Sequence, residues 1–380
     1  MVYDPLIQVR TALATTTNTT GVDGRTGVGG AEIQKVIDRM IVDNVNRGLD
    51  FRPLVPRKPA DQQAYIWNIR TNLGSTSKAA VYSEGATGTP YPSTKNQMVA
   101  SIISFRSDYE VTGQMQSASA SYYNAMMDES KDALDAMKIM EEKMMICGDE
   151  TGAYGFANAF DGLLQLMRWN GSNGGDTEAT AANDMADTST IFGTARADAT
   201  NRYFLDCSYV LGGTVGTSTG TLELRHLNES IRRSNKKNAK GNRRIFFCSD
   251  ARADEISQLL QPQQRFIAGA SQLTLEGGFV VMTYRGIPII GSIYMDKNGA
   301  TNTTSWDTAT GADNSMYLLD MDNIEVRILN GVDYKNVPIS GVDASSRSDA
   351  SGGYFKTYEI LVMKRFNSQV HIANLTAPVS

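Results

Sequence analysis

Residues 114–150 carry one long helical pattern, which ends at Gly148. A helix of about 34 residues rises roughly 50 Å at 1.5 Å per residue, and this is the width of a whole domain. The structure that such a helix supports must be broad and flat or elongated. Compact enzymes rarely need an element of this length.

An apolar stripe follows the predicted helix at three- and four-residue spacing. Its members are mostly Met and Ala: Tyr123, Met126, Ser130, Ala133, Met137, Met140, Met144 and Cys147. The opposite side is expected to face solvent or a polar neighbour and carries Asp128, Lys131, Asp132, Asp135, Lys138, Glu142 and Lys143. A coiled coil is the alternative, although four heptads are near the minimum for one and Ser and Ala make weak knobs.

Composition excludes several classes of protein. The chain has 380 residues, 41% of them hydrophobic, which suffices for a sizeable core in about two to three globular units. A formal net charge of -5 provides no global positive field for non-specific binding of nucleic acid. Cys147, Cys207 and Cys248 lack the spacing of a zinc site or a disulfide framework, so a reducing cytosol fits best. No stretch predicts a signal peptide or a membrane span.

The N-terminal part contains little that can fold by itself. Residues 11–30 are small, polar and Gly-rich and predict an arm, and 31–48 predict a short amphipathic helix capped by Gly48. Strand patterns at 65–70 and 98–112 flank a stretch with several turn signals. Because an isolated hairpin is marginal in water, we expect this pair to find its partner on another subunit or domain. A structureless active-site lid is the alternative.

Strand and helix patterns alternate from about residue 203 onward, at 203–212, 221–237, 243–250, 251–261, 277–293 and 316–329. This order predicts a compact α/β unit of about 120 residues. The last segment, 354–378, has two further strand patterns and should return to pair with an earlier element. Residues 171–200 are polar and predict a surface loop.

The sharpest match to a catalytic motif is the G-x-S-x-G at 216–220, which places Ser218 between a strand pattern and a helix pattern, as in a nucleophile elbow. A triad would then need a downstream His, and only His371 follows, inside a strand pattern. His226 is expected on a helix face. Two histidines without a carboxylate cluster predict no metal site. No G-x-x-x-x-G-K-[ST] motif occurs, and the glycines of GVDGRTGVGG precede a helix pattern but follow no strand pattern, so we expect no cofactor.

A dense run of basic residues is opposed only by Glu229, and it comprises Arg225, Arg232, Arg233, Lys236, Lys237, Lys240, Arg243 and Arg244. Such a cluster can face a polyanion or an acidic protein neighbour. The alternative is a solvated helix end whose cations complement the helix C-terminus. No aromatic platform is interleaved for base stacking, so a helix end or a protein neighbour is favoured.

The order of arm, amphipathic helix, extended hairpin, long helix, α/β unit and returning strand resembles that of the major capsid proteins of tailed bacteriophages, which have the Hong Kong 97-type fold. Local sequences agree with this. AVYSEGA resembles a turn in the family's extended loop, and 140–167 resembles the end of its spine helix followed by a Gly-rich turn. RRIFFCSDARADEISQLL and YRGIPIIGSIYM resemble parts of its axial domain. Each motif is weak alone, and their order carries the resemblance.

The resemblance implies an α+β capsid subunit without catalytic activity. Its parts would be an N-terminal arm and short helix (1–50), an extended loop (51–112), a peripheral domain with the spine helix (113–202 and 326–380) and an axial domain (203–325). Hexamers and pentamers of the subunit would form an icosahedral shell around double-stranded DNA, with portal, scaffold or decoration proteins as partners. The protein would assemble in the host cytoplasm and reside in the virion. The Met and Ala stripe should then pack on the peripheral domain's own sheet, not on a second copy of the helix.

Some family members cross-link themselves through a loop lysine, an asparagine in the final segment and a glutamate seven residues later. The last two positions align with Thr357 and Lys364, which cannot do this chemistry. We therefore expect no isopeptide bond, although Lys78 and Lys95 lie in the loop. Encapsulins, which share the fold and enclose cargo enzymes, are the first alternative, and a serine hydrolase built on Ser218 is a distant one.

Overall fold

The structure is a computed structural model that describes residues 48–72, 84–85, 87, 92–119, 124–148, 159–167, 190–195, 204–212, 220–264, 273–274, 280–295, 315–339, 350–373 and 375–376. The chain divides into two units, and the first, Met1–Val45 with Ala120–Tyr123, lies outside these residues. All described residues belong to the second unit, Asn46–Ser119 with Asn124–Ser380. The predicted arm, nearly all of the predicted short helix and the polar 171–200 loop, apart from its 190–195 segment, lie outside the described residues.

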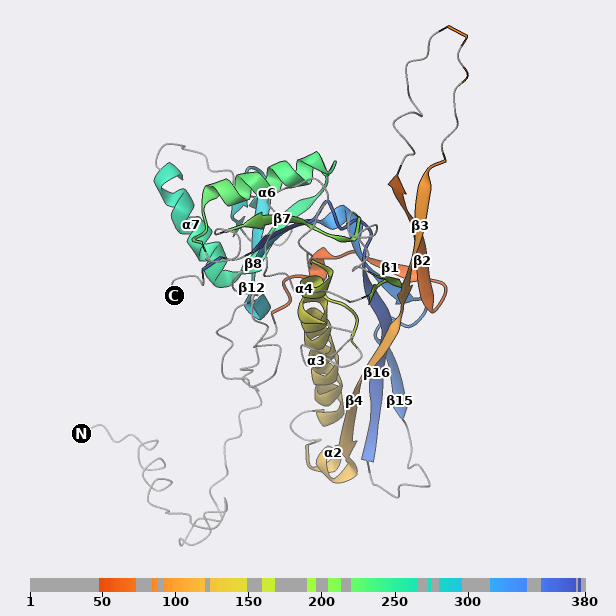
Figure 1. Ribbon diagram of the computed structural model, residues 1–380. Coiled ribbons are helices and arrows are strands. Elements are labelled where there is room, and N and C mark those ends of the chain that lie inside the picture. The colour runs from red at the N-terminus through yellow and green to blue at the C-terminus, as the bar shows by residue number, and fades with distance from the viewer. Residues whose placement is uncertain are drawn as a thin grey trace, which may run out of the picture. The chain divides into compact units, whose positions relative to one another are not determined.

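One sheet has six strands in the order β11-β12-β8-β13-β17-β7 (Figure 1). Their bounds are β7 Ser208–Leu211, β8 Arg244–Ser249, β11 Thr283–Tyr284, β12 Ile287–Ser292, β13 Met316–Asp320 and β17 Val370–Ala373. β8 pairs in parallel with β12, and β17 pairs in parallel with β7. Two helices follow strands of this sheet, α6 (Leu224–Lys236) after β7 and α7 (Asp250–Gln264) after β8. The predicted alternation of strand and helix is confirmed.

The central strands β8 and β13 of this sheet are buried on both faces, which explains their near-continuous apolar sequences. On β8, Phe246 and Cys248 belong to a cluster that includes residues of both α6 and α7. Ile245 and Phe247, which alternate with them, belong to a larger cluster that reaches the second sheet. Because successive side chains on a strand point to opposite faces, α6 and α7 cover the same face of the six-stranded sheet.

The second sheet has five strands, ordered β1-β14-β16-β15, with β4 also paired to β16. Their bounds are β1 Arg57–Ala60, β4 Ile103–Thr112, β14 Ile324–Leu329, β15 Lys335–Ile339 and β16 Ala350–Met363. The 14-residue β16 is central and pairs antiparallel with β4, β14 and β15. The prediction that the last segment returns to earlier elements is confirmed, because β16 lies in this sheet and β17 in the other.

Two strand patterns of the sequence are each divided between different partners. Residues 316–329 form β13 in one sheet and β14 in the other, with the turn η4 (Met321–Asn323) between them. Residues 98–112 form the end of β3 (Thr94–Ser101) and all of β4. Composition did not reveal either division because both parts of each pattern are equally strand-forming. The predicted domain of 113–202 with 326–380 stays a prediction, and β17 hydrogen bonds within the six-stranded sheet.

Shorter elements complete the described chain. β2 (Ala64–Asn72) pairs antiparallel with β3, as predicted from the two strand patterns. Two small pairs and three single turns also occur: β5 (Thr190–Ile191) with β6 (Thr194–Ala195), β9 (Leu273–Thr274) with β10 (Val280–Val281), η1 (Arg52–Leu54), α4 (Leu163–Leu166) and η3 (Ile293–Met295). Among the helices described, none has the length and hydropathy needed to cross a bilayer.

The prediction of one unbroken helix over 114–147 is wrong. The structure has α2 (Gly113–Ser119) and a separate α3 (Ala125–Cys147) of 23 residues. Asn124 has an extended backbone, and its side chain accepts a hydrogen bond from the Met127 N–H at 3.1 Å. This is the geometry of an N-cap, so a new helix begins at Ala125.

The end of α3 at Gly148 agrees with the sequence prediction. The Gly148 N–H donates to the Met144 carbonyl at 2.8 Å, and the Gly162 N–H donates to the Gly148 carbonyl at 2.9 Å. A Cβ on Gly162 would lie only 2.6 Å from the Gly148 nitrogen. Both glycines therefore allow a close approach of two backbones at the end of the helix.

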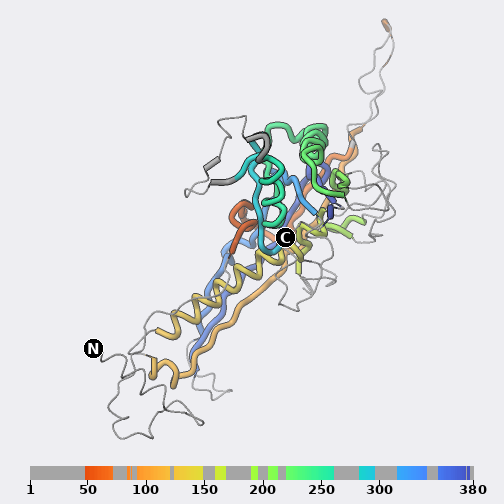
Figure 2. The backbone as a smooth tube through the Cα atoms, turned by 90° about the vertical axis from the view of Figure 1, so that its left-hand side faces the viewer, coloured from red at the N-terminus to blue at the C-terminus, as the bar shows by residue number. Residues whose placement is uncertain are grey.

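The helix packs on its own chain's sheet, as the resemblance implies. Ala133 and Met137 cluster with Tyr109 of β4 and Phe355 of β16, and Figure 2 shows α3 running beside these strands. The prediction is wrong at one position of the stripe and at one position of the polar side. Met140 is 39% exposed, whereas Glu142, assigned to the solvent side, is buried because the segment at 50–52 covers it.

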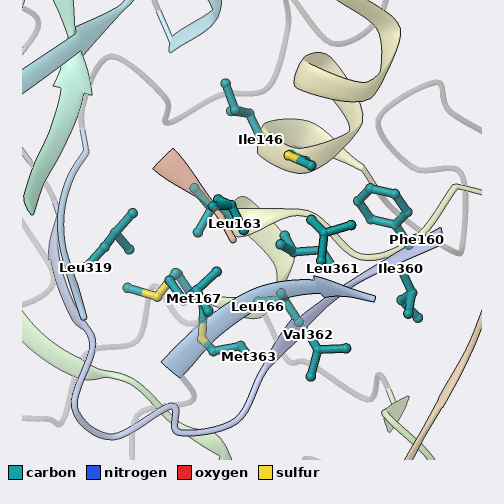
Figure 3. Packing of buried hydrophobic residues seen from close by; sticks show 14 of the residues in the cluster. Ile146, Phe160, Leu163, Leu166, Met167, Leu319, Ile360, Leu361, Val362 and Met363 are labelled. Carbon is teal, nitrogen blue, oxygen red and sulfur yellow. The ribbon is translucent and has the colours of Figure 1, made fainter. Parts of the chain in front are cut away.

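The main core lies where α3 ends. Ile146 of α3, Leu163 of α4 and Leu361 of β16 belong to one cluster, and Figure 3 shows them with their neighbours. Phe247 of β8 and Leu319 of β13 belong to the same cluster, so this core joins the two sheets.

Candidate functional site

The β2–β3 pair has one covered face and one exposed face. On the covered face Trp67 lies opposite the buried Met98, and its ring centroid is 5.4 Å from that of Tyr65. On the other face Ile66 lies opposite Val99 and is 47% exposed. The pair therefore has a core on one side only, as expected for an element that gains a partner elsewhere.

Arg327 of β14 fixes the root of this pair on the five-stranded sheet. Its Cζ atom lies 4.2 Å from the centroid of the Tyr65 ring, a cation–π contact. Its Nη2 donates to the Tyr65 hydroxyl and its Nη1 to the Pro59 carbonyl, each at 3.1 Å. One planar guanidinium thus connects β14 to β1 and β2.

Glu325 is a buried carboxylate surrounded by three cations. Its oxygens lie 2.8 Å from the Nζ of Lys58, 2.7 Å from the Nζ of Lys364 and 2.5 Å from Nη2 of Arg327. Burial alone would raise the pKa of Glu325. The hydrogen bonds from Lys364, Lys58 and Arg327 outweigh burial and lower its pKa to about 2.

Glu142 of α3 binds the chain just before the β1 strand. Its carboxylate accepts hydrogen bonds from the backbone N–H of Phe51 and of Arg52 at 2.7 Å and from that of Asp50 at 3.1 Å. The first N–H groups of a helical turn have no carbonyl acceptor within the turn itself, and at the start of η1 the Glu142 carboxylate supplies one. Burial raises the pKa of Glu142, and the three hydrogen bonds oppose the shift.

A second ionic cluster lies beside it and joins α3, β1 and β16. The Arg57 guanidinium contacts Glu141, and its Nη2 lies 2.8 Å from both Glu359 and Asp333. Arg52 also pairs with Glu141, at 2.8 Å. Burial and the charge of Glu141 raise the pKa of Glu359 well above its usual value, although Arg57 opposes the shift, so Glu359 takes up a proton more readily than an exposed carboxyl does.

The predicted basic cluster is largely engaged within its own chain. Arg225 pairs with Glu223 at 2.7 Å, and Arg232 and Arg233 both pair with Glu229, at 2.5 and 2.8 Å. These contacts lie at the start of α6 and along it. The expectation that Glu229 alone opposes the run is therefore wrong, because Glu223 supplies a second counter-charge.

The remaining members lie at and beyond the end of α6. Arg243 donates to the Leu54 carbonyl at 3.0 Å and Arg244 to Asn235 at 2.8 Å, so both connect elements of the fold. Lys236 and Lys240 are exposed and Lys237 is half-buried, in the place where cations complement a helix C-terminus. That this cluster faces a polyanion or a neighbour stays a prediction.

The histidines lie where the sequence predicts, one on a helix and one on a strand. His226 is on α6, and its Nδ1 accepts from the Glu223 N–H at 3.1 Å. His371 is on β17, where its ring stacks on Tyr317 at 4.7 Å between centroids. Ser218 lies outside the described residues. Within the described part of the chain, no group of three potential metal ligands occurs.

The positions aligned with the family's cross-link have other roles. Thr357 is fully buried on β16, and Lys364 pairs with Glu325. Lys95 is exposed on β3, and Lys78 lies outside the described residues. The absence of an isopeptide bond stays a prediction.

Sequence reasoning missed the buried ionic residues, although signals for them exist. Glu141 and Glu142 lie in IMEEKMMIC, where apolar residues occupy every side of the helix. Glu325 and Glu359 each interrupt an apolar strand pattern, in NIEVRIL and TYEILVM. A charge inside such a run indicates a buried counter-charge. The sequence does not say which distant cation supplies it.

Comparison with known proteins gives one family match. The model of the family described as SU10 major capsid protein matches residues 16–348. No curated protein matches the sequence of the chain significantly.

Solved structures of similar fold come from several kinds of particle. A chain of the cyanophage A-1(L) capsid asymmetric unit is 15% identical in sequence and has a TM-score of 0.62, and the match covers 90% of this chain and 97% of that one. A chain of the capsid of a native GTA particle is 11% identical and has a TM-score of 0.60, and the match covers 92% of this chain and 97% of that one. A chain of the holo-SrpI encapsulin complex from Synechococcus elongatus is 10% identical and has a TM-score of 0.56, and the match covers 92% of this chain and 95% of that one. These likenesses show a shared fold.

Proposed function

Because the chain belongs to the SU10 major capsid protein family, we propose that its copies assemble as hexamers and pentamers into the icosahedral shell of a tailed phage and enclose double-stranded DNA. The chain is a capsid shell protein of the virion, with a structural role. The match over residues 16–348 carries this conclusion, since it spans most of the chain. Portal, scaffold and decoration proteins are proposed as further partners.

The β2–β3 pair supports assembly through contacts between copies. Its root is held to the five-stranded sheet of the same copy by the hydrogen bond from Arg327 to the Tyr65 hydroxyl, and its open face exposes Ile66. A neighbouring copy that covers this face would supply the missing core, as interfaces between subunits of an assembly do.

The encapsulin likeness favours a second candidate, a shell that encloses a cargo protein. The contents of purified particles distinguish the two. Particles from infected cells, treated with nuclease and then opened, are expected to release protected double-stranded DNA. Particles that hold a cargo protein and no DNA would instead support the encapsulin function.

The lysines at the end of α6 are proposed to face a neighbouring copy. Lys236 and Lys240 are exposed at and just beyond the C-terminal end of α6, where their charges can be reached by another protein. Replacement of Lys236 and Lys240 by Gln should therefore weaken shell assembly and leave the amount of packaged DNA per particle unchanged. Normal assembly would identify these lysines as a solvated helix end.

A further inference from the structure

The cations around Glu325 exceed the negative charge that they surround. Lys58, Arg327 and Lys364 make three ion pairs with this one carboxylate. Among the ion pairs of the described residues, none links these cations to a second carboxylate. A surplus of positive charge therefore remains at the root of the β2–β3 pair.

The two lysines present this surplus to solvent. The side chain of Lys58 is 49% exposed and that of Lys364 is 31% exposed, whereas that of Glu325 is only 3% exposed. Lys364 also lies 5.9 Å from the centroid of the Tyr65 ring. Because Glu325 already holds both ammonium groups in place, an incoming anion loses little affinity to ordering them.

We propose that Lys58 and Lys364 bind a carboxylate side chain of a second copy of this chain in the assembled shell. The inference rests on the proposed assembly. The chain has 41 Asp and Glu against 36 Lys and Arg, so carboxylates are the anions that a shell of identical copies supplies in excess. The contact joins the root of one copy's β2–β3 pair to its neighbour, and salt weakens it by screening.

Carbodiimide coupling of mixed shells tests this contact directly. Shells assembled from equal amounts of unlabelled and heavy-isotope-labelled subunits are treated with the carbodiimide, which joins amines to carboxylates in contact. Digestion should yield Lys58 or Lys364 peptides joined to an Asp or Glu peptide, with one heavy and one light member. The inference would be overturned if either lysine couples only to carboxylates of its own copy or to another protein. It would also be overturned if neither lysine couples at all. If the native chain forms no shells, the proposed function fails instead.

Neutral variants test the contribution of the contact to assembly. The double substitution Lys58→Gln and Lys364→Gln leaves Arg327 to balance Glu325, so the subunit keeps its buried pair. The subunit concentration needed for shells should rise about tenfold, a typical loss for an interfacial charge pair. Lys335→Gln, which removes an exposed lysine of β15, serves as the matched control. Equal threshold concentrations for the control and the double variant would overturn the inference.

Discussion

Replacement of Glu142 by Ala should release the segment before β1 from α3. The carboxylate accepts two backbone hydrogen bonds at 2.7 Å and one at 3.1 Å, and its side chain is fully buried. A hydrogen bond to a charged group contributes about 1.5–3 kcal/mol, and the contributions of one group are not additive. The Phe51 N–H would stay buried without an acceptor. We expect a loss of about 3–5 kcal/mol in the free energy of unfolding.

Urea unfolding of unassembled subunits, followed by tryptophan fluorescence, measures this loss. Glu142→Gln keeps one carbonyl acceptor, so its loss should be about half as large. Glu129→Ala removes an exposed carboxylate from the same helix and should change the free energy of unfolding by less than about 0.5 kcal/mol. A change below about 1 kcal/mol for Glu142→Ala would refute the reasoning. It would mean that packing of the Phe51 ring, 5.1 Å from that of Phe247, holds the segment by itself.

Further predictions concern assembly, acid stability and cross-linking. Met137→Pro should prevent shells in electron micrographs, because proline costs about 3 kcal/mol or more within a helix; normal particles would exclude a strut role for α3. Deletion of 72–96 should leave a soluble subunit that forms no closed shells by gel filtration, and intact particles would show that this stretch is dispensable. Folding lowers the pKa of Glu325 from 4.5 to about 2. Above pH 4.5 its ionised carboxylate therefore adds about 3 kcal/mol to the free energy of unfolding, and this contribution is lost as the pH falls toward 2. Glu325→Gln should remove this part of the pH dependence of urea unfolding, and an unchanged profile would contradict it. Mature particles boiled in reducing detergent should run as a single monomer band, and a ladder of multimers would contradict the absence of isopeptide bonds.

Local patterns in the sequence predicted elements well. Strand composition identified β2, and helical patterns identified α6 and α7. The order of elements along the chain indicated the capsid fold through its resemblance to the tailed-phage capsid proteins. The same patterns placed Ala133 and Met137 on the buried side of α3. These features depend on residues close together in the chain.

Features that depend on distant residues were not predictable in this way. Helical periodicity places Glu142 on the polar side of α3, and only the segment at 50–52, some ninety residues earlier, makes the position buried. The break at Asn124 was missed for a local reason, because its hydrogen bond from the Met127 N–H lies within a helical pattern that continues on both sides. Two of the three cations around Glu325, Lys58 and Lys364, come from β1 and the end of β16, and only tertiary structure brings them to the carboxylate.

Electron microscopy of the expressed chain tests the central claim most directly. A shell protein should form closed particles of uniform diameter, with the same subunit fold repeated over the surface. The experiment is repeated over a range of protein and salt concentrations and with the phage's own assembly partners present. If only monomers or irregular aggregates form under all of these conditions, the assignment to a capsid shell is contradicted.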